Sequence, residues 1–138
     1  MPGYSGTPLA RKLGIKDQFR VALVHVPPDV QAELESAFGK CQIVRPSAGA
    51  LDFVFLFSKS RVALEREVMR AARALAPDGM LWIAWPKKSS GVPSDLDENL
   101  IRETGLGIGL VDVKVCAVTG IWSGLKFVIP VKNRPKRN

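Results

Sequence analysis

Hydrophobic runs of strand length alternate with segments of helical periodicity along this chain. The run at 51–58 is the clearest, because five large apolar residues follow one another from Phe53 to Phe57 without alternation. Such a run is typical of a strand that is buried on both faces of a parallel sheet, and it requires helices on both sides. Three further strands are predicted by the shorter apolar runs at 20–26, 41–45 and 80–85.

Helical spacing recurs between these runs. A short helix is predicted to end at Gly14, and a second to begin at Pro28, where no N–H is needed, and to be capped at Gly39. A third helix is predicted to begin after Ser60, whose hydroxyl suits the N-cap position. The first part of the chain therefore consists of strand–helix units.

The later part of the chain begins with a turn at 77–79, where proline, aspartate and glycine follow one another. After the strand at 80–85, Ser94 and Asp97 have the spacing of a capping box, so we expect a helix to start at Ser94. The glycines at 105, 107 and 109 end this helix.

Two strands at 111–118 and 124–131 close the sequence. Their connection is too short for a parallel crossover, so we expect an antiparallel hairpin. The predicted fold is a three-layer α/β domain with a mainly parallel sheet that ends in this antiparallel hairpin. We expect one α/β domain over 1–131 and a flexible basic tail over 132–138.

Composition excludes several classes of protein. A chain of 138 residues with 46% hydrophobic residues has enough material for one core. Its apolar runs are far shorter than the roughly 20 residues that cross a bilayer, and its first residues lack the apolar region of a signal peptide. Cys41 and Cys116 form neither a disulfide framework nor a metal site. We therefore expect a cytoplasmic protein with no membrane partner.

The formal net charge of +7 favours solubility and weak binding of polyanions. Four basic residues lie in the tail at 132–138, which could contact nucleic-acid phosphates without regard to base sequence. No nucleic-acid-binding motif accompanies them, so nucleic acid is a weakly supported partner, and a solubilising tail is the simpler interpretation.

The loop that follows the strand at 80–85 is the first candidate site. In parallel α/β sheets, ligands bind beyond the carboxyl ends of the strands. Ammonium groups, hydroxyls and free backbone N–H groups there would favour a phosphate or a carboxylate. The alternative is a solvated loop with ordinary surface lysines. The candidate residues of this loop are Lys87, Lys88, Ser89 and Ser90.

Three more candidate ligand-binding residues lie at other strand ends. His25, the only histidine, follows the first strand and could act as a base, although no carboxylate partner is near it in sequence. Lys59 follows the strand at 51–58 and could add a positive charge to the same crevice. Trp122 is predicted to be exposed in the hairpin connection, where it could stack on a planar ligand or contact a protein partner. The simpler alternatives are a hydrogen-bonded histidine and a solvated lysine.

The chain also resembles known families. Five segments together resemble an uncharacterised bacterial family of short proteins that carries only a domain-of-unknown-function label, and this resemblance implies no activity. More distantly, the segments at 51–57 and 75–83 are similar to the fourth strand, and to the turn and fifth strand, of class I methyltransferases. The five segments are 4–15, 51–57, 75–96, 109–118 and 122–128.

The methyltransferase resemblance implies a shortened Rossmann-like fold in which one strand–helix unit is missing between Arg45 and Leu51. It also implies the strand order 2-1-3-4-6-5, in which the last strand lies antiparallel beside the fourth. In that fold, a glycine-rich G-x-G-x-G turn after the first strand receives S-adenosylmethionine, and an acidic residue after the second strand holds the ribose. This chain has the glycine-free segment 25–29 at the first position, with two prolines, and Arg45 near the second. We interpret the usual cofactor site as lost.

These observations lead to three hypotheses. The first is a methyltransferase-like domain without normal cofactor binding that acts as a regulatory or binding module for a small anionic ligand or a protein partner. The second is an active S-adenosylmethionine-dependent methyltransferase with an atypical donor loop. The third is a weak nucleic-acid-associated protein. No metal or catalytic residue is assigned.

Overall fold

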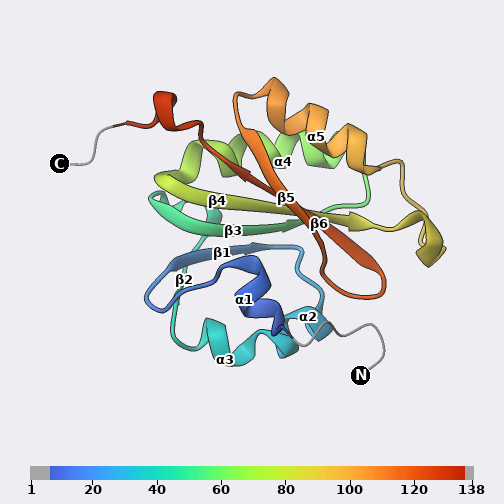
Figure 1. Cartoon of the computed structure of the whole chain (residues 1–138), viewed down its shortest axis with the longest axis horizontal. Coiled ribbons are helices and arrows are strands. Elements are labelled where there is room, and N and C mark those ends of the chain that lie inside the picture. Colours follow the sequence, from blue (N-terminus) through green and yellow to red (C-terminus); the bar gives the residue numbers. More distant parts are fainter. Residues whose placement is uncertain (1–6, 136–138) are drawn as a thin grey trace.

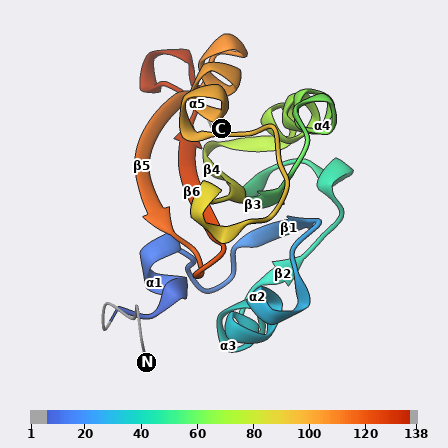
Figure 2. The ribbon, with the colours of Figure 1, turned by 90° about the vertical axis from the view of Figure 1, so that its right-hand side faces the viewer.

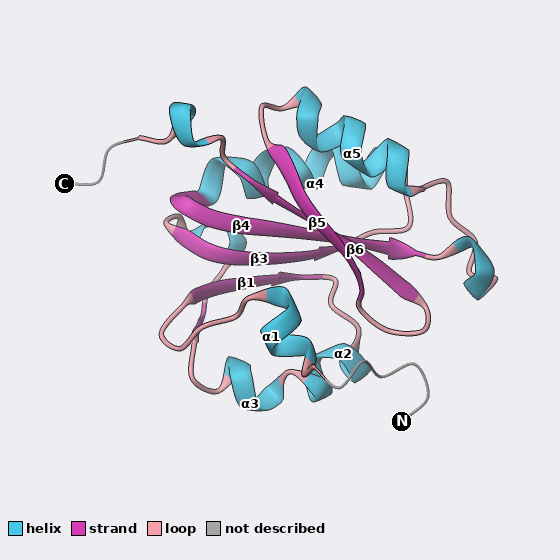
Figure 3. Ribbon diagram, viewed as in Figure 1, coloured by secondary structure: helices cyan, strands magenta, loops and turns pink. Residues whose placement is uncertain are grey.

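A six-stranded mixed sheet forms the centre of the computed structural model, which describes residues 7–135 (Figures 1 and 3). The strand order is β2-β1-β3-β4-β6-β5, as the sequence predicts. The first four of these strands are parallel, and β6 is antiparallel to both of its neighbours. The strands are β1 (Arg20–Val24), β2 (Gln42–Ile43), β3 (Leu51–Phe57), β4 (Leu75–Pro86), β5 (Val111–Ala117) and β6 (Trp122–Val128).

Helices cover both faces of the sheet (Figure 2). On one face lie α1 (Leu9–Leu13), α2 (Pro28–Glu33) and α3 (Glu35–Phe38), and on the other lie α4 (Arg61–Ala74) and α5 (Glu98–Gly107). Three short 3₁₀ helices, η1 (Pro46–Ala48), η2 (Lys88–Ser90) and η3 (Val131–Asn133), lie in the connections. The three-layer α/β architecture is therefore confirmed.

The core divides into two clusters because β3 is buried on both of its faces. Phe53 and Phe55 pack toward α1, α2 and α3, whereas Val54 and Leu56 pack toward α4 and α5, and all four side chains have no exposed surface. Burial of a large apolar side chain contributes about 1.5–3 kcal/mol. This central strand thus holds the two helical layers together.

The expected turn at 77–79 is part of β4 instead. This strand begins at Leu75, which pairs with Leu51, and the next pair joins Phe53 to Met80. Two steps along β3 therefore correspond to five along β4, so the four residues 76–79 lie opposite Asp52 alone and form a large bulge. A Cβ atom at Gly79 would overlap the backbone carbonyl of Leu51, so only glycine fits there.

Two helix boundaries also differ from the prediction. The segment 28–38 forms two short helices that are separated at Leu34, although Pro28 does occupy the first helical position. The fourth predicted helix begins at Glu98, and its N-cap is Asp97, whose carboxylate accepts a hydrogen bond of 2.8 Å from the N–H of Leu100. Ser94 lies three residues before this cap and does not cap the helix.

β5 is an edge strand with a protected edge. Two steps along β5, from Asp112 to Lys114, correspond to one step along β6, so Val113 forms a bulge. Bulges and charged side chains on an edge strand disfavour pairing with another sheet.

The predicted tail at 132–138 is described only in part, because 136–138 lie outside the described residues. Within it, the side chain of Arg134 donates to the carbonyl of Ile129 at 2.9 Å. Within 7–135 no helix combines the length and the apolar character needed to cross a membrane.

Candidate functional site

A cavity of about 360 Å³ opens beyond the carboxyl ends of β1 and β3. It contains three of the predicted ligand-binding residues, His25, Lys59 and Trp122, which come from three different strand ends. Ligand sites in proteins have volumes of roughly 300–1,000 Å³, so this cavity suits a small molecule. Its remaining lining consists of Pro27, Phe57, Ser58, Ser60, Ala63 and Glu67.

His25 has a carboxylate partner that the sequence did not reveal. Its Nε2 atom lies 2.6 Å from a carboxylate oxygen of Glu67 on α4, although 42 residues separate the two in sequence. The His25 side chain is 65% exposed and that of Glu67 is 18% exposed. His25 also adopts a left-handed backbone conformation with φ of 57°, which is uncommon outside glycine but is enriched for histidine. The backbone thus turns sharply after β1 and directs the imidazole toward α4.

Lys59 lies in a tight turn between β3 and α4. The hydroxyl of Ser58 donates to the carbonyl of Ser60 at 3.0 Å, and the N–H of Ser60 donates back to that hydroxyl at 3.3 Å. Ser58 is buried, whereas Lys59 is exposed between two residues whose positions are set by these bonds. Among residues 7–135, no carboxylate forms an ion pair with Lys59. Its positive charge is therefore available at the cavity.

Trp122 is buried, contrary to the prediction of an exposed side chain. It is the first residue of β6, pairs with Pro86 of β4, and is only 8% exposed. Its ring contacts that of Phe57 edge to face, with centroids 4.9 Å apart. Aromatic pairs of this kind are worth about 0.5–1.5 kcal/mol beyond their buried area. Trp122 therefore forms a rigid apolar wall of the cavity.

The loop after β4 does not line this cavity. The ammonium group of Lys87 donates to the carbonyl of Thr119 at 3.1 Å, and the Ser90 hydroxyl donates to the carbonyl of Lys87. These bonds close the η2 turn and hold it against the connection between β5 and β6. Lys88 and Ser89 are exposed on that turn. The structure thus brings His25, Lys59 and Trp122 to one cavity, and the four candidate residues of this loop lie beside it without lining it.

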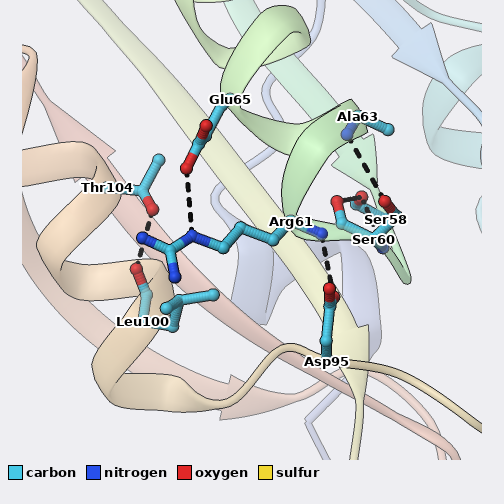
Figure 4. Close-up of polar contacts among 8 residues, drawn as sticks. All are labelled: Ser58, Ser60, Arg61, Ala63, Glu65, Asp95, Leu100 and Thr104. Carbon is cyan, nitrogen blue, oxygen red and sulfur yellow. Dashed lines mark hydrogen bonds and ion pairs between the residues drawn. The ribbon is translucent and has the colours of Figure 1, made fainter.

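Ser94 and Asp95 connect the same loop to the start of α4. Figure 4 shows Asp95 beside the N–H of Arg61. The Ser94 hydroxyl donates to the carbonyl of Lys59 at 2.9 Å, and the carboxylate of Asp95 accepts from the N–H of Arg61 at 2.8 Å. The predicted cap Ser60 also accepts from the N–H of Ala63, at 3.4 Å. These oxygens occupy the N–H groups of Arg61 and Ala63, so few backbone donors of the helix N-terminus remain for a bound anion.

We expect Asp95→Ala to lower the free energy of unfolding by about 1 kcal/mol, because it removes an acceptor from the first turn of α4. Asp95→Asn keeps an acceptor at that position and should cost only the charge–dipole interaction, about 0.3–1 kcal/mol. Urea denaturation followed by circular dichroism measures both values. Equal stability of the wild type and Asp95→Ala would show that this bond does not hold the loop to the helix.

The segment after β1 presents few backbone donors. Pro27 and Pro28 are the N-cap and first residue of α2, and neither has an N–H group. The carbonyl of Val26 accepts a hydrogen bond of 3.2 Å from the side chain of Gln31, which closes the turn on itself. Beyond β2, Arg45 is exposed and precedes the η1 turn.

Comparison with known proteins identifies the fold. No family model matches the chain, and no curated protein matches it in sequence. Solved structures do match. Magnesium protoporphyrin IX methyltransferase (ChlM) from Synechocystis PCC 6803, with bound SAH, has a TM-score of 0.58 and 13% identity over 88% of this chain and 78% of its own. The fold is that of class I methyltransferases, in a shortened form.

Two other neighbours agree with this assignment. N-methyltransferase NodS from Bradyrhizobium japonicum WM9 has a TM-score of 0.55 and 12% identity, and covers 88% of this chain and 92% of its own. A TehB-like SAM-dependent methyltransferase from Corynebacterium glutamicum has a TM-score of 0.54 and 12% identity, over 93% of this chain and 90% of its own. At these identities the likeness concerns the fold alone.

A second cavity, of about 380 Å³, lies between α4 and α5 on the outer surface of the helical layer. Val68, Met69, Leu100 and Ile108 supply its apolar lining. Arg61, the first residue of α4, is its only lining residue near the strand ends at which α/β folds bind ligands. In the described part of the chain, no group of three or more histidine, cysteine, aspartate or glutamate side chains is arranged to hold a metal ion.

Proposed function

We propose that this chain is a methyltransferase-fold domain that has lost the usual S-adenosylmethionine site and binds a small anion with an apolar part in the cavity at His25, Lys59 and Trp122. The observation that carries the proposal is the convergence of these three side chains on one cavity at the strand ends. Lys59 supplies a charge without an ion-pair partner among residues 7–135, and Trp122 with Phe57 supplies an apolar wall.

The residues after β1 and β2 do not fit S-adenosylmethionine. Close approach of the backbone to this cofactor requires glycines and free N–H groups, but Pro27 and Pro28 remove two donors there. The exposed Arg45 follows β2, near the place where the methyltransferase resemblance expects a carboxylate for the ribose hydroxyls, and its charge supports the loss of that contact. No methyl-transfer step is therefore assigned to the chain.

Isothermal titration of the full chain with S-adenosylmethionine and with S-adenosylhomocysteine tests the loss of the cofactor site. We expect no saturable binding at millimolar concentrations. Micromolar binding of either compound would favour the alternative function, an active methyltransferase with an atypical donor loop, and would overturn the proposal.

Benzoate and benzyl alcohol test the anion site separately, because they share a ring but only benzoate carries a charge. We expect benzoate to shift the amide signals of Lys59 and Ser60 in a saturable way, and benzyl alcohol to bind more weakly. Lys59→Gln should weaken benzoate binding about fivefold, the upper end for an exposed charge pair. Lys88→Gln is the matched control, since Lys88 is exposed outside the cavity. Equal effects of the two variants, or no saturable shift, would contradict the anion site.

A further inference from the structure

A second group of positive charges lies on the opposite side of the molecule from α4 and α5. It consists of four lysines, which we call the lysine cluster: Lys12 of α1, Lys16 of the following loop, Lys114 of β5 and Lys126 of β6. Figure 2 shows α1 beside the end of β5, so these elements meet at one corner of the sheet. None of the four lysines lines either cavity described above.

Strand register places two of these lysines side by side. Lys114 and Lys126 are directly opposite each other in the antiparallel pair of β5 and β6. Side chains in this relation have Cβ atoms about 4.5–5.5 Å apart, and like charges there destabilise the sheet. The bulge at Val113 produces this arrangement, because it sets Lys114 rather than its neighbour against Lys126.

Contacts with α1 bring in the other members of the lysine cluster. The ammonium group of Lys114 donates to the carbonyl of Lys12 at 3.0 Å, so the edge strand and the end of the helix touch. Lys126 pairs with Trp82 on its other side, and its stem is partly buried. Burial, together with the charges of Lys114 and Lys16, lowers the pKa of Lys126. Among residues 7–135 no carboxylate forms an ion pair with any of the four.

The charge of Lys126, partly buried and directly opposite Lys114, opposes folding. Because the pKa of Lys126 in the folded protein lies below its ordinary value, its positive charge at neutral pH is less favourable in the folded than in the unfolded chain. Features that a fold retains at a cost to stability are typical of functional sites. A bound polyanion would supply the counter-charges that the described residues do not.

We infer that the lysine cluster binds the phosphate backbone of nucleic acid without regard to base sequence. Lysine is a flexible point charge that contacts phosphates without the fixed geometry that recognition of a base edge requires. The cluster is spread over three elements and one loop and lines neither cavity, so it suits an extended chain of phosphates better than a small anion.

Fluorescence anisotropy of a labelled, mixed-sequence DNA duplex tests this inference with the full chain. Each phosphate contact contributes about 0.9 to the slope of log K against log salt concentration, so four lysines predict a slope near −3.6. We expect Lys16→Gln combined with Lys126→Gln to weaken binding at least roughly tenfold at about 0.1 M NaCl and to reduce the slope by about two.

Arg66→Gln combined with Arg73→Gln is the matched control. It removes the same charge from exposed residues of α4 that form no ion pair among residues 7–135. We expect this control to weaken binding less than about threefold. Equal losses for the two double variants would show a diffuse charge effect and would overturn the inference, as would no binding by the wild type at about 50 mM NaCl.

Two further measurements complete the test. Thermal melting should show that the Lys16→Gln, Lys126→Gln double variant is at least as stable as the wild type, because it removes a charge that opposes folding. A lost affinity with raised or unchanged stability therefore cannot result from unfolding. Stronger binding to vesicles of phosphatidylserine and phosphatidylcholine than to the duplex would assign the cluster to a membrane surface and overturn the inference. The outcome does not depend on the benzoate site, since none of its lining residues is changed.

Discussion

Trp82→Phe is expected to lower the free energy of unfolding by about 3 kcal/mol, from lost burial and an unpaired carbonyl together. The Trp82 side chain has no exposed surface, and its indole Nε1 donates to the carbonyl of Leu13 at 2.9 Å. This carbonyl belongs to the last residue of α1, so the bond anchors that helix to β4. Phenylalanine would leave a gap and would leave the Leu13 carbonyl without its partner.

Trp85→Phe is the matched control for this prediction. Trp85 lies on the same strand and is only 5% exposed, but its indole makes no hydrogen bond to residues 7–135. The same chemical change there should cost about 1 kcal/mol, since only apolar contacts are lost. Urea denaturation followed by circular dichroism avoids the change in tryptophan fluorescence. An equal cost at both positions would mean that the bond to Leu13 contributes nothing.

The fold was predictable because its strands carry local signals. The unbroken apolar run from Phe53 to Phe57 indicates a strand buried on both faces, and the short connection between the last two strands requires a hairpin. The resemblance to class I methyltransferases adds the position of the last strand beside the fourth, and the predicted order agrees with the observed sheet. Local patterns thus predict the elements, whereas the order of the sheet also depends on the resemblance.

Boundaries were less predictable where a distant contact decides them. Pro77 and Gly79 have the composition of a turn, yet pairing of Leu75 with Leu51 extends β4 back to the end of α4. Similarly, Ser94 has the sequence of a helix cap, but its hydroxyl donates to the carbonyl of Lys59 instead. Each error has the same physical cause: a tertiary hydrogen bond competes with the local one.

The meeting of His25 and Lys59 was predictable, but the partner of His25 was not. His25 and Lys59 follow adjacent parallel strands, so their meeting at one edge of the sheet follows from topology. The ion pair of His25 with Glu67 does not follow from topology, because nothing in the sequence around Glu67 distinguishes it from the other charged residues of α4. The pairing of Lys114 with Lys126 was equally hidden, since a bulge at Val113 sets the register. Register depends on the assembled sheet rather than on local periodicity.

Gly105→Ala is expected to destabilise the protein by about 2 kcal/mol, although alanine is the better helix former. Gly105 lies within α5, where alanine would contribute about 1 kcal/mol through helix propensity. A Cβ atom there would overlap the ring of Phe127, which is fully buried on β6. Overpacking of a tight core costs typically 1–3 kcal/mol and sometimes more, and the overlap is severe. The steric cost should therefore exceed the gain in propensity.

Gly107→Ala tests this balance on the same helix, because a Cβ atom at Gly107 meets nothing within 4 Å. With only the propensity term acting, it should stabilise the protein by up to about 1 kcal/mol, so the two alanine variants should shift the urea midpoint in opposite directions. A double-mutant cycle with Phe127→Leu then isolates the contact. The smaller side chain should make Gly105→Ala less costly by about 0.5–3 kcal/mol, as expected for residues in direct contact. Additive effects in that cycle would mean that α5 shifts away from β6 rather than pressing on Phe127.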